Sequence, residues 1–133
     1  MFDTYMIETV PLALIVARPK GILDASESMR IVEFIELKET ESETGFNRFC
    51  DLTGLDGIRL SFAEVSELAA RRARFNPNNI HVKSAYLAKE ALSIDIARMY
   101  AQLLCSERIE VRVFSKLEDA ADWLGVKPDR LRL

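Results

Sequence analysis

The stretch that decides the fold is residues 109–126, IEVRVFSKLEDAADWLGV. Its first six residues are rich in β-branched and aromatic side chains, which is typical of a strand in the interior of a sheet. Ser115 and Glu118 then match the S-x-x-E capping box that opens a helix. The apolar residues that follow recur at helical spacing: Leu117, Ala120, Ala121 and Leu124. The pattern predicts a strand and a helix that packs back on the sheet.

The rest of the chain alternates in the same way between strands and helices. Apolar or alternating runs predict further strands at residues 5–9, 12–18, 46–52 and 80–88. Capping signals at Asp24 and Ser61 open two helices, and residues 93–106 form another. Strands joined by helices require right-handed crossovers, so we expect an α/β sandwich with a mainly parallel, mixed sheet. It should have about five strands and about four helices, with the first strand as an antiparallel edge.

Composition and charge set limits on the class of protein. The 133 residues are 49% apolar and 29% charged, as in ordinary globular proteins, and predict a single domain over residues 1–133. The net charge of −3 argues against nucleic-acid binding, which needs a basic excess. The apolar run at residues 11–17 is too short to span a bilayer and lacks the flanks of a signal peptide. We therefore expect a cytoplasmic protein without a transmembrane segment, with Cys50 and Cys105 as buried free thiols.

Three motifs resemble the SpoIIAA-like family: DLTGLDG at residues 51–57, AYLAKEALSIDIARMY at 85–100 and VRVFSKLEDAADWLGV at 111–126. The fold of that family is shared by STAS domains, which include anti-sigma-factor antagonists, and by lipid-binding CRAL-TRIO domains. The resemblance covers nearly the whole chain and implies a SpoIIAA/STAS-like sandwich. It implies a non-enzymatic regulatory or binding module that acts through the loops around residues 51–61. A carrier of a small apolar or lipid-like ligand is the alternative.

Ser61 is the candidate phosphorylation site that the resemblance suggests. In anti-sigma-factor antagonists a strand ending in Asp-Leu precedes a loop with a phosphorylatable serine at a helix start. Residues 51–52 match that pair and Asp56 matches the aspartate before the serine, but residues 57–58 are Gly and Ile. A phosphate on Ser61 would lie at the positive end of a helix dipole. As a simple N-cap, Ser61 would stabilise the helix by about 1 kcal/mol.

A candidate binding site follows from the topology, because open α/β sheets bind ligands beyond the carboxyl ends of their strands. Three segments should meet there: residues 51–60, residues 88–93 and the helix start at Ser115. The tentative ligand-binding residues are Asp51, Thr53, Asp56, Arg59, Ser61 and Lys89. Such a cluster suits a protein partner or a small anionic ligand, although turn residues are also polar because they face water.

Catalytic and metal sites are weakly indicated. Asp51 and Asp56 alone fall short of a metal signature, so we expect no metal and no cofactor. His81 is expected inside a strand, and nothing in the sequence lowers the pKa of Cys50. An enzyme that uses Cys50, His81 or the loop aspartates is the least favoured alternative.

Two further features have a structural and a functional interpretation. The arginines at 71, 72 and 74 end their helix, where cations complement the negative dipole end. Alternatively, they would contact an acidic protein surface or phospholipid headgroups. In the second case the protein would bind the membrane peripherally, and stable binding would need a second membrane-binding signal. Trp123 lies at the flank of the apolar stripe, where it either closes the core or contributes to a homodimer interface.

Overall fold

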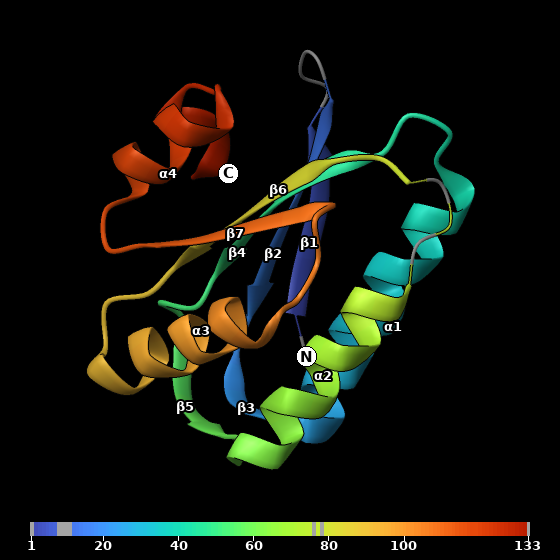
Figure 1. Cartoon of the computed structure of the whole chain (residues 1–133). Helices are drawn as coiled ribbons and strands as arrows, with labels where there is room; N and C mark the ends of the chain where they lie inside the picture. The colour runs from blue at the N-terminus through green and yellow to red at the C-terminus, as the bar shows by residue number, and fades with distance from the viewer. Residues whose placement is uncertain (1, 8–11, 76, 78, 133) are drawn as a thin grey trace.

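Within residues 2–7, 12–75, 77 and 79–132, which the computed structural model describes, the chain forms two sheets and four α-helices (Figure 1). The strands are β1 (Phe2–Ile7), β2 (Ala13–Pro19), β3 (Gly21–Asp24), β4 (Phe46–Asp51), β5 (Leu55–Arg59), β6 (Val82–Leu87) and β7 (Ile109–Phe114). The helices are α1 (Ala25–Glu41), α2 (Phe62–Arg74), α3 (Ala91–Leu103) and α4 (Leu117–Leu124), followed by the short 3-10 helix η1 (Pro128–Leu131).

The main sheet has the strand order β1-β2-β4-β6-β7. β1 pairs antiparallel with β2, and every later neighbour pairs in parallel. Helices α1, α2 and α3 lie in the crossovers between successive parallel strands, as the alternating pattern predicts. The expected mixed, mainly parallel sheet with an antiparallel first strand is confirmed. The prediction that the strand at residues 109–114 lies in the interior of the sheet is wrong. This strand, β7, forms the edge opposite β1.

Helices cover both faces of the main sheet. Figure 1 shows α4 and the C-terminus on one side of the sheet and α1, α2 and α3 on the other. Successive residues of a strand point to opposite faces, so Leu14 and Val16 of β2 pack with α4 while Ile15 packs near α1. This double cover explains why β2 reads as a continuous apolar run.

The small sheet of β3 and β5 was not expected. The sequence predicts a loop at residues 51–60, but Leu55–Arg59 pairs in parallel with Gly21–Asp24. β5 contains an aspartate and a glycine, both poor strand formers, and its partner lies far away in the sequence. Local pattern therefore carries no signal for this pairing. Leu23, Leu52 and Ala97 pack in one cluster, so the small sheet closes against the end of β4 and against α3.

Two of the three predicted helix caps are confirmed. The Asp24 side chain accepts from the Glu27 backbone N–H at 2.9 Å, and Ser61 forms a complete capping box with Glu64. The Ser115 cap is wrong, because α4 begins one residue later with Lys116 at its N-cap and no side-chain cap bond. The Glu118 carboxylate accepts instead from Arg132 Nη2 at 2.5 Å, which removes the reciprocal arm of the expected box.

Several element boundaries differ from expectation. The first strand runs over Phe2–Ile7 instead of residues 5–9, and residues 8–11 lie outside the described part of the chain. Residues 76 and 78 of the predicted turn also lie outside it. Helix α3 ends at Leu103 instead of residue 106, which leaves Cys105 beyond the helix and exposed. The expectation that both thiols are buried is therefore wrong for Cys105, and Cys50 is half-buried.

The last helix packs as its apolar stripe predicts. Ala120, Ala121 and Leu124 are buried, and Gly125 ends α4 in the left-handed conformation at φ +74°. Trp123 is half-buried, with its ring centroid 5.7 Å from that of Phe114. Trp123 thus closes the edge of this core. No helix among the described residues is both long and apolar enough to cross a membrane.

Candidate functional site

The predicted strand-end residues begin with Asp51, the last residue of β4. Its Oδ1 accepts from the backbone N–H of Thr53 at 2.9 Å and from the Thr53 hydroxyl at 2.6 Å. Its Oδ2 lies 3.5 Å from Arg18 Nε. Asp51 therefore fixes the turn between β4 and β5, which is a common role for an aspartate followed by a turn.

The other predicted residues do not form a cluster with Asp51. Asp56 and Arg59 lie in β5, Lys89 lies between β6 and α3, and all three side chains are exposed. Within the described part of the chain, Asp51 and Thr53 are the members of the predicted set that hydrogen bonds join. The strand-end loops thus present separate polar groups to solvent.

Ser61 is exposed and fully engaged in the cap of α2. Its Oγ accepts from the Glu64 backbone N–H at 3.1 Å, and Glu64 Oε1 accepts from the Ser61 backbone N–H at 2.9 Å. A phosphate on Ser61 would gain the favourable field of the helix N-terminus but would face the Glu64 carboxylate at close range. The capping role that the sequence predicts is confirmed, and phosphorylation stays a prediction.

An apolar cavity lies behind this surface, between the main sheet, the small sheet and three helices. Its volume is about 100 Å³. Residues that line it come from β2, β4 and β6 of the main sheet, from β3 and β5, and from α1, α2 and α3. Among them are Leu23, Ile31, Leu52, Ile58, Val65 and Ala97. Ile58 and Leu60 belong to the segment 51–61, so the inner side of the predicted site forms one wall of the cavity.

A second cavity of about 60 Å³ adjoins the first and has polar residues in its wall. The two cavities share Ile31, Val32, Cys50, Tyr86 and Tyr100 as lining residues. The polar lining residues of the second cavity include Arg48 and Ser84, which are paired neighbours in β4 and β6, and Arg72 of α2. Apolar space therefore leads to a polar end that lies against the middle of the main sheet.

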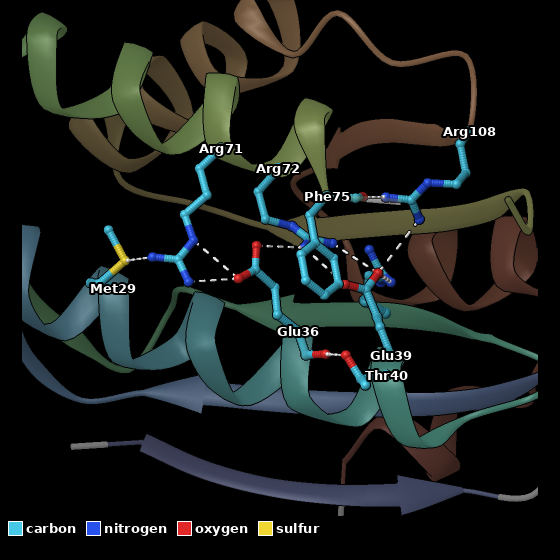
Figure 2. Close-up of polar contacts among 9 residues, drawn as sticks. Met29, Glu36, Glu39, Thr40, Arg71, Arg72, Phe75 and Arg108 are labelled. Carbon is cyan, nitrogen blue, oxygen red and sulfur yellow. Dashed lines mark hydrogen bonds and ion pairs between the residues drawn. The ribbon is translucent and has the colours of Figure 1, made fainter. Parts of the chain in front are cut away.

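Beside that polar end, α1 and α2 are joined by an arginine–glutamate network (Figure 2). Arg72 makes two bonds to Glu39, at 2.8 and 2.9 Å, and one to Glu36 at 3.2 Å. Arg71 holds Glu36 at 2.7 and 3.0 Å. Arg108 lies 3.5 Å from Glu39, and Arg48 Nη2 donates to the same carboxylate.

The charges in this network shift one another's pKa. Burial alone would raise the pKa of Glu39, but the hydrogen bond from Arg72 and the charges of Arg48 and Arg72 hold it below its usual value. Burial would likewise lower the pKa of Arg72, yet the hydrogen bond and charge of Glu39 raise it. For Arg48, burial dominates and the pKa is lowered, since Glu39 and the neighbouring Arg72 pull in opposite directions. The carboxylates therefore offset the cost of burying the Arg72 charge, but they do not offset it for Arg48.

Sequence reasoning missed this network. It assigned Arg71 and Arg72 to the helix dipole or to an acidic partner or headgroup, whereas both pair with glutamates of α1. Arg72 is buried and is unavailable to a membrane surface. The signal that would have found the network is Arg48, a charge in the middle of a strand that is covered on both faces.

Cys50 and His81 do not form a nucleophile pair. Burial, with help from the charge of Asp51, raises the pKa of the Cys50 thiol to about 12, so the reactive thiolate is scarce. His81 was expected inside a strand but precedes β6 and is exposed. Cys50 pairs with Tyr86 of the neighbouring strand, and His81 precedes Tyr86 by five residues. An extended chain of that length spans about 16 Å, so Cys50 and His81 lie far apart along the strand direction. Within the described residues, no three His, Cys, Asp or Glu side chains are grouped to hold a metal ion.

His81 instead lines a polar groove of about 500 Å³ at the amino ends of β6 and β7. Glu107, Glu110 and Asp122 also line it, as does Lys83. The Lys83 ammonium donates to the Trp123 carbonyl at 3.0 Å and lies 5.3 Å from the centre of the Trp123 ring. This groove lies at the opposite end of the strands from the predicted site.

Comparison with known proteins identifies the fold. No protein-family model matches the chain, and no curated protein matches it. Among solved structures, it is similar to an uncharacterised protein of the DUF3478 family, with a SpoIIAA-like fold, from Shewanella loihica. The identity is 16%, the match covers 92% of this chain and 93% of the other, and the TM-score is 0.61. The chain therefore has the SpoIIAA-like fold that its three motifs predict.

Proposed function

We propose that this chain is a non-enzymatic binding module that takes a small, largely apolar ligand into the cavity between its two sheets. The observation that carries the proposal is the apolar cavity of about 100 Å³, whose walls come from the main sheet, the small sheet and three helices. Ligand sites in proteins are concave and mostly apolar, with a few polar groups. The apolar cavity and the adjoining cavity with polar lining residues together match this description.

The size of the cavity restricts the ligand. An apolar protein cavity of about 150 Å³ can hold benzene, so a cavity of about 100 Å³ is suited to ligands of that size or smaller. A short alkyl chain or a single ring fits this space, whereas a phospholipid acyl chain does not. The carrier hypothesis is thereby narrowed from lipid-like molecules in general to small ones.

Ligand binding would also reach the outer side of segment 51–61, which we propose as a docking surface for a partner. Leu52, Ile58 and Leu60 line the cavity, while Thr53, Asp56 and Arg59 of the same segment are exposed. Because exposed and lining residues alternate along one short stretch, a ligand that shifts the wall also shifts the outer groups. This coupling would give the regulatory function expected from the sequence resemblance a physical route.

The first test is methyl NMR with a small apolar probe. Hexan-1-ol or benzyl alcohol should move the methyl signals of Ile31, Val65 and Leu68, which line the cavity. Ala97→Leu fills the cavity from α3 and should abolish those shifts. Ala91→Leu, on the exposed first residue of the same helix, is the matched control and should leave them unchanged. Equal shifts in both variants would overturn the proposal.

Native mass spectrometry of the protein purified from its source supplies an independent test. A bound small molecule that disappears from the Ala97→Leu variant supports the module. A clean apo mass for the wild type, combined with no methyl shifts, counts against it.

A second candidate function is docking of a protein partner beside Ser61, and Phe62 is the observation that favours it. Phe62 is the first residue of α2 and is 63% exposed, which is unusual for a large aromatic side chain. Phe62→Asp should remove a specific partner in cross-linking and pull-down experiments. Leu37→Asp, at a residue on α1 that is 56% exposed, is the control. A partner that is lost from both variants, or from neither, would remove Phe62 from consideration.

A further inference from the structure

The arginine–glutamate network contains more guanidinium groups than carboxylates. Four arginines, at positions 48, 71, 72 and 108, contact the two carboxylates of Glu36 and Glu39. The Arg71 side chain is 38% exposed and is solvated in part by water. Arg108 also donates to the Phe75 carbonyl at the carboxyl end of α2, where the helix dipole is negative. The shortage of negative charge relative to arginine is therefore felt mainly by two buried guanidinium groups, those of Arg48 and Arg72.

Arg72 and Arg48 differ in how well they are satisfied. Arg72 makes three bonds to the two carboxylates. Arg48 is 8% exposed, its Nη2 donates to Glu39, and its buried Nε has no hydrogen-bond acceptor within the described part of the chain. A buried donor on a charged group is costly to leave unpaired, so this position calls for an acceptor.

The place of Arg48 in the cavities shows what kind of molecule would supply that acceptor. Arg48 lines the polar cavity together with Ser84, Tyr86 and Tyr100, and that cavity shares five lining residues with the apolar one. We propose that the ligand of this module is a small amphipathic carboxylate, with its carboxylate at Arg48 in the polar cavity and its apolar part in the adjoining apolar cavity. This inference rests on the proposed function and adds the chemical class of the ligand.

A carboxylate fits the polar cavity better than other anions. Its planar pair of oxygens matches the donors of a guanidinium group, and its charge offsets the excess of arginine. The cavity of about 60 Å³ accommodates a carboxylate more readily than a phosphate, which carries more oxygens. A trapped water is the competing occupant, because it also offers one acceptor to Arg48 Nε.

The decisive experiment compares matched ligands on the wild-type protein. Hexanoate and hexan-1-ol share an alkyl chain, and benzoate and benzyl alcohol share a ring, so each pair differs in the charged head alone. Isothermal titration calorimetry or methyl NMR at neutral pH should give at least tenfold tighter binding for each carboxylate, because charge-assisted bonds to a guanidinium are strong. The Arg48 Hε signal should also move with hexanoate and stay in place with hexan-1-ol.

Two variants locate the head group. Arg48→Lys keeps a positive charge but removes the Nε donor and the planar fork, so the carboxylate preference should fall below threefold while alcohol binding is retained. Arg30→Lys is the matched control, at an arginine on α1 whose side chain is 69% exposed, and should keep the full preference. Retained alcohol binding in Arg48→Lys shows that the variant is folded and that its apolar cavity is intact.

The outcomes separate the two proposals. If alcohols bind as tightly as carboxylates in the wild type, a water occupies the polar cavity, and the inference about the head group is overturned while the binding module stands. If Arg48→Lys retains the full carboxylate preference, the head group lies elsewhere and the assignment to Arg48 is wrong. If neither class of ligand binds, the proposed function itself fails.

Discussion

The two faces of the main sheet are built from alternate residues of the same strands, and they differ sharply in character. On the face toward α4, Leu14, Val16 and Phe49 pack with apolar helix residues in one buried cluster. On the face toward α1, α2 and α3, β4 and β6 present Arg48 and Ser84, and both cavities open there. The middle of the α4 face is a closed apolar core, with its polar groove confined to the amino ends of β6 and β7, whereas the opposite face has charge and empty space at its centre. We infer that the first stabilises the fold and the second binds the ligand.

Phe49→Ala tests the closed face and should give the largest effect. Phe49 is fully buried in the cluster under α4, so its removal leaves a cavity in a packed core. The free energy of unfolding should fall by about 3–5 kcal/mol, as measured by urea denaturation. Phe62→Ala, at an exposed residue, should change it by less than about 0.5 kcal/mol. A similar small loss at Phe49 would show that the α4 face is not the stabilising core.

Glu39→Gln tests the charged face. The substitution leaves Arg48 and Arg72 without their shared carboxylate, which should cost about 3 kcal/mol, at the lower end of the range for breaking a buried pair. The lower end applies because Gln keeps an acceptor oxygen and Glu36 still holds Arg72. Glu43→Gln, at an exposed glutamate, is the control.

The same variant should change the dependence of stability on pH. The pKa of Glu39 is lower in the folded protein than its usual value of 4.5. Its stabilising contribution is therefore fully present above about pH 4.5 and is lost as the pH falls through the folded pKa. Stability measured between pH 3 and pH 6 should thus decline less steeply toward acid in Glu39→Gln than in the wild type. An unchanged slope would mean that Glu39 is not held charged by its arginines.

Thiol labelling compares the cavity side of the sheet with an exposed position. Cys50 has a pKa of about 12, so at pH 8 its thiolate fraction is on the order of one in ten thousand. The higher intrinsic reactivity of a basic thiolate offsets part of this loss, which leaves Cys50 roughly fiftyfold slower than an ordinary exposed thiol. Cys105 is exposed and should react at the fast rate. Cys50→Ser and Cys105→Ser isolate the two reactions, and equal rates would contradict the raised pKa of Cys50.

Ser61→Ala should give the smallest effect, at the rim of the binding face. It removes one arm of the capping box, which should lower the free energy of unfolding by about 1 kcal/mol. Ligand affinity should be unchanged, since Ser61 does not line the cavities. Ser66→Ala, within the same helix, is the control. A change in ligand affinity would show that the cap and the cavity wall move together.

The main sheet and the α4 face were accessible from sequence because their signals are local. The apolar run of β2 and the stripe of α4 each report one strand or helix and the face that it buries. The small sheet and the arginine–glutamate network depend on residues that are far apart in the chain, such as Arg48 and Arg108. Arg48 inside a strand does signal a buried charge, but composition and spacing do not say which distant carboxylate pairs with it or that β3 pairs with β5.

The candidate site shows the same division. The sequence predicts a binding site in segment 51–61, and predicted site residues such as Thr53, Asp56 and Arg59 are exposed on its outer side. The cavity lies on the inner side, and a cavity is a property of how several helices and strands from the two sheets pack together. No local pattern encodes the space that remains between side chains.

The shared carboxylate of Glu39 also has a consequence for how the chain reaches its fold. Its partners come from α2, from β4 and from the residue before β7, so the contacts form only when these segments have all docked. Until then each arginine is better solvated in water than in a partly assembled interior. A misaligned β4 would bury Arg48 without its carboxylate, so the network favours a single register of the central strands. We expect Glu39→Gln to speed unfolding and to leave the folding rate nearly unchanged, which stopped-flow measurements would show.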